Sequence, residues 1–144
     1  MSPASADAPL PTASDEQSVR VVTVAFNPGE ELDRFLASLA AATVRRLTVV
    51  IADNGTEHDV VTAAAQRYGA RVVGDGTNLG YGAGANLAAA DLQEDWLVVA
   101  NPDLIWRPGS LDVLIDAGLA NPAAGCLGPL LLNTDGTVYP SGRA

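Results

Sequence analysis

The 144-residue sequence has one cysteine, one histidine and only eight lysine or arginine residues, against seventeen aspartate or glutamate residues. A single cysteine excludes a disulfide within the chain, and Cys126 and His58 are too few ligands for a structural zinc site. The formal net charge of −9 repels a phosphate backbone, and no basic cluster offers a local exception, so nucleic acid is not an expected partner. No apolar run approaches the roughly 20 residues that a membrane-spanning helix needs. These absences favour a soluble protein of the reducing cytoplasm.

The length of the chain suits one domain, since domains of roughly 100 to 150 residues are the commonest. Residues 1–18 are rich in alanine, serine, proline and acidic residues, and they lack the basic start and apolar core of a secretion signal. We expect this stretch to be a disordered tail, followed by one folded domain over residues 19–144.

From position 19 onward, β-branched runs alternate with helical periods, which is typical of βαβ units around a mostly parallel sheet. Strands are predicted at residues 19–25, 47–52, 70–73 and 96–100. Helices are predicted to begin at Asn27 and Pro28, which suit an N-cap and a first turn, then after the turn at 53–55, at 83–90, and from Pro108. Residues 127–132 and 138–139 flank a turn and predict a hairpin. The predicted fold class is α/β, with a Rossmann-like, mostly parallel sheet and flanking helices.

Three of the expected helices carry an apolar stripe that would pack on the sheet. Cys126 is expected to be a small buried residue, and Trp96 and Trp106 are expected to serve in packing rather than as sugar platforms. The three stripes are Leu32, Phe35, Leu36 and Leu39; Val61, Ala64, Ala65 and Tyr68; and Leu111, Leu114, Ile115 and Leu119.

Polar clusters follow three of the predicted strands, at residues 26–27, 53–55 and 101–103. In open α/β sheets ligands bind outside the carboxyl ends of the strands, where loops diverge and helix N-termini present free N–H groups. The sequence therefore predicts a ligand site formed where these clusters meet.

Asp53 leaves a buried strand and could accept hydrogen bonds from a base N–H or a ribose hydroxyl. Asp-Asn-Gly is equally a strong turn tripeptide, and the residues alone favour neither interpretation. His58, at the start of the next helix, is expected to be a solvated surface residue rather than a catalyst.

Residues 74–84 are so rich in glycine and asparagine that we expect a loop leading into a helix. Such a loop lets the backbone approach a diphosphate, and the helix N-terminus favours anions. The spacing matches neither a Walker loop, which needs a lysine, nor the Rossmann fingerprint, which follows the first strand. On the residues alone, a flexible connection is favoured over a phosphate cradle.

Asp103 is the carboxylate best suited to bind a metal ion, because an oxygen ligand at a strand end can hold Mg²⁺ or Mn²⁺ against a diphosphate. Asn101 could support the same ion less strongly. An Asn-Pro-Asp turn with no metal role explains the same residues equally well.

Four segments taken together, at residues 21–27, 52–55, 78–82 and 100–103, resemble those of family 2 glycosyltransferases, which have the GT-A fold. The combination of Asn-Leu-Gly-Tyr-Gly with a later Asn-Pro-Asp is highly specific, and the resemblance runs from about residue 19 to the end. The pattern is most similar to bacterial L-rhamnosyltransferases that use dTDP-rhamnose and act on N-acetylglucosaminyl-diphospho-decaprenol. It implies that residues 19–144 form the nucleotide-sugar-binding half of such an enzyme.

The resemblance also implies roles for individual residues. Asp53 would read the pyrimidine base, residues 78–82 would border the ribose and diphosphate, and Asp103 would bind Mg²⁺ or Mn²⁺. The wider family has two acids flanking one residue at the last motif, whereas this chain has Asn101 in the first place. The implied nucleotide-sugar-binding residues are Ala25, Phe26, Asn27, Asp53, Asn54, Asn78, Gly80, Tyr81, Gly82, Asn86 and Asn101.

The activity implied is an inverting, in-line transfer of L-rhamnose from dTDP-rhamnose to a lipid-linked or polysaccharide acceptor in cell-wall glycan synthesis. Family members continue for about as many residues again, so the general base is expected beyond Ala144 and this chain is expected to bind donor with little or no transfer. A lipid-linked acceptor implies a peripheral position at the inner face of the membrane, and a homodimer is compatible with the resemblance.

Two alternatives stay open at this point. One is a non-catalytic module that binds a nucleotide sugar without turnover. The other is a nucleotidyltransferase, which is disfavoured because the loop after the first strand, residues 27–31, is acidic where a triphosphate would need basic residues.

Overall fold

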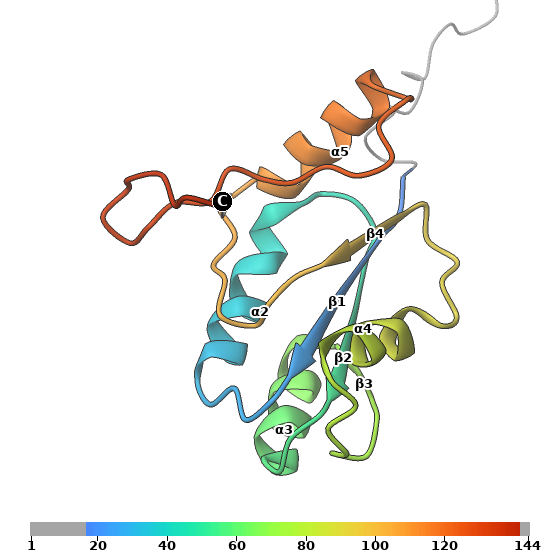
Figure 1. The fold of residues 1–144 in the computed structure, drawn as a ribbon, viewed down its shortest axis with the longest axis vertical. Coiled ribbons are helices and arrows are strands. Elements are labelled where there is room, and N and C mark those ends of the chain that lie inside the picture. Colours follow the sequence, from blue (N-terminus) through green and yellow to red (C-terminus); the bar gives the residue numbers. More distant parts are fainter. Residues whose placement is uncertain (1–16, 142–144) are drawn as a thin grey trace, which may run out of the picture. The chain divides into compact units, whose positions relative to one another are not determined.

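A computed structural model describes residues 17–141 of the chain (Figure 1). It divides into two compact units, the first ending at Asp112 and the second beginning at Val113. The expected tail lies almost wholly outside the described residues, and its disorder stays a prediction. Its last residue, Ser18, is buried and donates hydrogen bonds of 2.8 Å from both its N–H and its hydroxyl to Asp95.

The first unit is built on a four-stranded, all-parallel sheet with the order β3-β2-β1-β4. Its strands are β1 (Val19–Ala25), β2 (Leu47–Asp53), β3 (Arg71–Val73) and β4 (Trp96–Val99). β1 lies in the middle, with Ala25 opposite Asp53 on one side and Val22 opposite Val99 on the other. The predicted α/β fold class is therefore confirmed, and the carboxyl ends of β1, β2 and β4 meet at one edge.

The central strand β1 is buried on both faces, whereas Leu97 and Val99 of the edge strand β4 are exposed. One face packs on α4 (Tyr81–Ala89), through Val22, Val24, Val50 and Ala52 of the strands and the small residues of the helix. Val19, Val21, Thr23 and Ala25, at the alternate positions of β1, point to the opposite face and are also buried.

Two further helices of the first unit pack against each other, α2 (Glu31–Ala42) and α3 (His58–Tyr68), and α3 also contacts β2 and β3. The predicted stripe of α2 is confirmed, since all four residues are buried. In α3 the prediction fails at Tyr68, which is 38% exposed. Tyr68 is the last residue before Gly69, which ends the helix in the left-handed conformation, and the side chain leaves the packed stripe there.

Two predicted helix starts were wrong. α2 begins at Glu31 with Glu30 at the N-cap position, instead of at Asn27 and Pro28. α4 begins at Tyr81 rather than at 83, so part of the glycine-rich segment is helical. In both cases tertiary contacts of the preceding residues, described below, decide where the helix starts.

The helix predicted after Pro108 is α5 (Ser110–Ala120), in which Leu111 and Ile115 are buried but Leu119 is exposed, contrary to prediction. In the second unit the predicted hairpin is reduced to a single antiparallel bridge between Leu132 and Val138 around the turn at 133–136. Cys126 is exposed rather than buried, because this segment forms no packed element around it. Within residues 17–141, no helix is long and apolar enough to cross a membrane.

Candidate functional site

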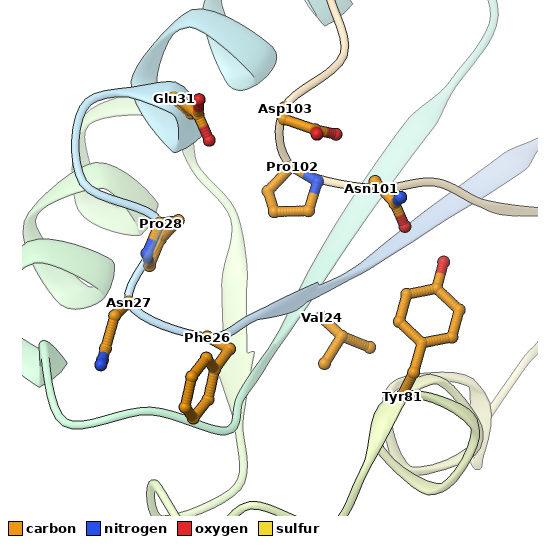
Figure 2. A pocket seen from close by; sticks show the side chains of 9 residues that line it. All are labelled: Val24, Phe26, Asn27, Pro28, Glu31, Tyr81, Asn101, Pro102 and Asp103. Atoms are coloured by element: carbon orange, nitrogen blue, oxygen red, sulfur yellow. The ribbon is translucent and has the colours of Figure 1, made fainter.

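An open cavity of about 270 Å³ lies at the carboxyl ends of β1 and β4 (Figure 2). Its walls come from the end of β1, the loop that leads to α2, the start of α4 and the segment that follows β4. Figure 2 shows the carboxylates of Glu31 and Asp103 toward one end of the cavity, and Phe26 and Asn27 toward the other. The lining residues are Val24, Phe26, Asn27, Pro28, Glu31, Tyr81, Asn101, Pro102 and Asp103.

The segment after β4 enters the cavity because the pairing of β1 and β4 continues one residue past the strand. The N–H of Ala100 donates to the carbonyl of Val22 at 3.1 Å. The chain then turns at once, with the N–H of Leu104 donating to the backbone carbonyl of Asn101 at 3.4 Å. This turn leaves the side chains of Asn101 and Asp103 exposed beside the end of β1.

The start of α4 is held against the sheet by two close contacts. Nδ2 of the buried Asn54 donates to the carbonyl of Gly80 at 3.0 Å. A Cβ at Gly84 would lie 3.1 Å from both Asn54 and Val24, so only glycine lets the helix approach this closely without adjustment. These contacts start the helix at Tyr81 and bring its ring into the cavity.

The hydroxyl of Tyr81 is turned toward the part of the cavity that holds Asn101 and Asp103 (Figure 2). Burial raises the pKa of this hydroxyl, and the negative charge of Asp103 raises it further. Tyr81 therefore stays protonated at neutral pH and can donate a hydrogen bond to an anionic ligand.

Asn27 joins the cavity to the loop after β2. Its φ of +48° is a left-handed conformation that asparagine tolerates better than most residues. Its Oδ1 accepts hydrogen bonds from the N–H groups of Thr56 at 2.7 Å and Glu57 at 3.2 Å. Asn27 thus holds the turn directly before α3 instead of capping the helix that follows it in sequence.

Asp53, at the end of β2, does not line the cavity and is only 5% exposed. Its Oδ1 accepts from the N–H of Gly55 at 3.2 Å, which is the turn contact expected of Asp-Asn-Gly. Its Oδ2 lies 2.6 Å from Nδ1 of His58. The hydrogen bond to Asp53 raises the pKa of His58 above 6.5; desolvation opposes the rise, and the charges of Asp53, Asp59 and Asp75 add to it.

Comparison with known proteins decides the family. Residues 20–140 match the model for glycosyl transferase family 2. The chain belongs to this family. As a family 2 glycosyltransferase, it has relatives with which both its sequence and its fold can be compared.

Two curated family members, both named N-acetylglucosaminyl-diphospho-decaprenol L-rhamnosyltransferase, come from the CDC 1551 / Oshkosh and ATCC 25618 / H37Rv strains of Mycobacterium tuberculosis. Each is 48% identical to this glycosyltransferase over a 135-residue alignment, and the match covers 85% of this chain and 44% of the relative. The chain therefore spans less than half of the length of these relatives.

The crystal structure of S. aureus TarS 1-349 matches with a TM-score of 0.57 at 20% sequence identity, over 71% of this chain and 31% of that one. At this identity the match concerns the fold alone, and it shows a GT-A-like arrangement of the sheet and helices.

The structure brings together five of the residues that the sequence predicted for the glycosyltransferase site, since Phe26, Asn27, Tyr81, Asn101 and Asp103 all line the cavity. The other predicted residues lie outside its lining: Ala25, Asp53, Asn54, Asn78, Gly80, Gly82 and Asn86. Their contact with a ligand, like that of the five lining residues, stays a prediction.

Several of these outlying residues support the site. Ala25 and Asp53 are buried at the strand ends, and Asn54 holds Gly80. Asn78 closes the loop before α4, since its Oδ1 accepts from the N–H of Gly80 at 3.0 Å. Two asparagines that the sequence suggested for direct ligand contact, Asn54 and Asn78, thus hold the backbone just before α4.

Glu31 lines the cavity although the sequence did not predict it there. An acidic residue in the first turn of a helix is ordinarily explained by the helix dipole, so Glu31 gave no separate signal of a site. Only the place of α2 beside the segment after β4 shows that its carboxylate and that of Asp103 share one cavity.

The donor set of the cavity suits a hard divalent ion, because the carboxylates of Asp103 and Glu31 and the amide of Asn101 all offer oxygen. Within residues 17–141, no three histidine, cysteine, aspartate or glutamate residues gather closely enough to hold a metal by themselves. Mg²⁺ commonly binds one or two carboxylates and completes its shell with waters and substrate phosphates. The residues present therefore fit an ion that binds together with a diphosphate.

Proposed function

We propose that this chain binds the sugar donor of a glycosyltransferase that moves L-rhamnose from dTDP-rhamnose to a lipid-linked or polysaccharide acceptor in cell-wall glycan synthesis. The choice of rhamnose is supported by the names of the two mycobacterial relatives. The choice of a nucleotide sugar is supported by the cavity, in which an exposed aromatic ring, a hydroxyl, two amides and two carboxylates meet at the carboxyl edge of the sheet.

The negative charge of the cavity is the observation that most strongly supports a donor bound together with a metal ion. Of its nine described lining residues, two are carboxylates and none is lysine, arginine or histidine. A diphosphate entering such a site meets like charge, and a divalent ion offsets that repulsion. We propose that Asp103 holds Mg²⁺ or Mn²⁺ with Asn101 and Glu31 close by, and that Tyr81 donates to an oxygen of the diphosphate.

The bound ion would stabilise negative charge on the nucleoside diphosphate as it leaves. In an inverting transfer, the acceptor hydroxyl attacks in line as the diphosphate departs, and a general base takes the hydroxyl proton. We propose that this base lies in the part of the relatives that the present chain does not span, so the chain binds donor with little or no transfer.

A lipid-linked acceptor would place the enzyme at the inner face of the membrane, on its cytoplasmic side. The same proposal leaves room for a homodimer, in which each copy binds its own donor through a cavity made of its own residues.

Isothermal titration calorimetry with dTDP-rhamnose, a UDP-sugar and a GDP-sugar, each with and without Mg²⁺ or Mn²⁺, tests the proposal. We expect dTDP-rhamnose to bind best and only with the ion. Asp103→Asn should lose most of the metal-dependent affinity, because it removes the negative oxygen ligand.

Glu30 and Glu31 provide a matched pair for the same measurement, since they are neighbours and only Glu31 lines the cavity. Glu31→Gln should weaken the metal-dependent binding, and Glu30→Gln should leave it unchanged. Metal-independent binding, or an unchanged affinity in Asp103→Asn, would show that the assigned ion site is wrong.

A further inference from the structure

The carboxylate of Asp53 is poorly accessible to a ligand. Its side chain is 7% exposed, and each of its carboxylate oxygens already has a partner, the N–H of Gly55 for one and the imidazole of His58 for the other. Its own carbonyl accepts from the N–H of Gly76 at 3.0 Å. A ligand that approaches this end of β2 meets the imidazole of His58 before it meets the carboxylate.

His58 is held in a defined orientation. A carboxylate only accepts hydrogen bonds, so Nδ1 of the imidazole carries the proton in the 2.6 Å contact with Asp53. Gly76 packs directly on the ring, since a Cβ there would overlap Cε1. The side chain is still 52% exposed, and Nε2 has no hydrogen-bonding partner among residues 17–141. Nε2 is therefore the polar group that this cluster presents.

The charges around His58 favour the form of the imidazole in which Nε2 is protonated. Asp53 from β2, Asp59 from α3 and Asp75 from the loop after β3 all act on the imidazole and favour its protonated form. In that form Nε2 also carries a hydrogen and donates. Three carboxylates so near disfavour a diphosphate at this position, whereas an uncharged carbonyl oxygen can accept without charge repulsion.

His58 is also linked to the cavity. Asn27, a lining residue, accepts hydrogen bonds from the N–H groups of Thr56 and Glu57, the two residues directly before His58. Asp53 ends the strand next to β1, so His58 lies at the same carboxyl edge that carries Phe26. A nucleotide whose diphosphate occupies the cavity can reach this edge with its base.

We propose that His58, rather than Asp53, contacts the pyrimidine base of the donor, with Nε2–H donating to a base carbonyl oxygen and Asp53 acting as the positioning residue. This inference rests on the proposed function, since it needs a pyrimidine nucleotide as ligand. It makes recognition of the base dependent on the protonation of one imidazole.

NMR provides a direct test, because His58 is the only histidine of the chain. Its imidazole C–H resonance is followed against pH, alone and with saturating thymidine, which has no phosphate to titrate in the same range. We expect thymidine to raise the pKa of His58 and to bind about tenfold more weakly once the imidazole is neutral.

Variants separate contact from positioning. His58→Ala should bind thymidine about tenfold more weakly, and His58→Gln, with an uncharged N–H donor, should bind with an affinity independent of pH. Asp53→Asn should lower the pKa of His58 and shift the pH dependence of binding with it. Asp59→Asn, which removes a nearby charge but no contact to Nδ1, should bind thymidine normally at low pH.

Equal or tighter binding by His58→Ala would overturn the inference, because it would mean that Asp53 contacts the base once uncovered. A pKa of His58 that falls on adding thymidine would also overturn it, since Nε2 would then accept. Failure of dTDP-rhamnose itself to bind the unaltered chain at any pH, with Mg²⁺ present, would instead overturn the proposed function and the inference with it.

Discussion

Gly76 has a φ of +85° and lies directly against the imidazole of His58. Gly76→Ala would place a methyl group where the ring and the carbonyl of Gly55 now lie, in a conformation that alanine rarely adopts. We expect it to lower the free energy of unfolding by about 2 to 3 kcal/mol, measured by urea denaturation.

Gly69→Ala is the matched control for this change. Its φ of +69° is similar, but a Cβ there meets nothing within 4 Å. It should cost about 1 kcal/mol, from backbone strain alone. Equal losses in the two variants would mean that the packing of Gly76 on His58 contributes nothing.

Single residues show where sequence analysis stops being informative. The motif around Asp53 and Asn54 pointed to a site, but whether each residue faces a ligand or a neighbour depends on partners far along the chain. Asn27 holds the turn before α3 rather than capping α2, and Asn54 holds Gly80, 26 positions away. His58 is exposed at the surface, as predicted, but its contact with Asp53 is defined only once the turn between them has folded.

α4 illustrates the same limit for a whole element. Its glycines have low helix propensity, so the sequence predicts that the loop continues to residue 82. Contact of Gly84 with Val24 and Asn54 outweighs this preference and starts the helix at Tyr81.

Gly84→Ala tests this contact. A Cβ 3.1 Å from Asn54 and Val24 would push α4 away from the sheet and move Tyr81 within the cavity. We expect a loss of about 1 to 3 kcal/mol in unfolding free energy, with weaker binding of dTDP-rhamnose in calorimetry.

Gly82→Ala, in the same helix but with nothing within 4 Å of a Cβ, is the control. It should leave stability unchanged or raise it by up to about 1 kcal/mol, because alanine is the better helix former. A loss of stability in both variants would show that the close approach of α4 at Gly84 is not what matters.

The connection from α4 to β4 is tied to β1 by a buried arginine. Arg20, 4% exposed, lies 2.6 Å from Asp91 and 2.9 Å from Glu94 through its two terminal nitrogens. Arg71 of β3 also pairs with Asp91 at 2.8 Å. Arg20→Met would leave Glu94, whose side chain is only 10% exposed, without its cation, and we expect a loss of about 3 kcal/mol in urea denaturation.

Arg71→Met is the control, because Arg71 is half-exposed and pairs only with the exposed Asp91. It should cost well under about 1 kcal/mol. A small effect of Arg20→Met as well would mean that the buried network does not stabilise the fold.

Glu94 gives the stability a defined pH dependence. Burial raises its pKa, but hydrogen bonds from Thr48, from the backbone of Gln93 and Glu94 and from Arg20 outweigh burial and bring the pKa down from 4.5 to about 2. A pKa lower in the folded than in the unfolded state means that the stabilisation is complete above pH 4.5 and is lost as the pH falls toward 2. The free energy of unfolding should decrease as the pH is lowered from 4.5 toward 2. In Glu94→Gln this decrease should be less steep.

Over the molecule as a whole, the sequence predicted the first unit well because its strands are short β-branched runs bounded by turns. All four strands were found within one residue of their predicted ends, and the parallel sheet follows from their alternation with helices. The second unit was predicted poorly, since its apolar residues at 127–132 suggested a strand but only one bridge forms. Apolar runs indicate strands only where another element is available to pair with them.

The assembled sheet also explains how polar residues far apart in the sequence come together. Parallel pairing of β1 with both β2 and β4 brings the polar clusters after all three strands to one edge. The resemblance named the correct family, but only the folded structure shows which of these side chains line the cavity. Asp103 faces the cavity, whereas Asp53 is covered by His58.

A crystal structure of the chain with dTDP-rhamnose and Mn²⁺, with the ion located by its anomalous scattering, tests the central claim most directly. We predict one Mn²⁺ at bonding distance, about 2.1 Å, from both Asp103 and the diphosphate, with Tyr81 beside the same diphosphate. A nucleotide bound elsewhere on the chain, or in the cavity with Mn²⁺ away from Asp103, would contradict the account.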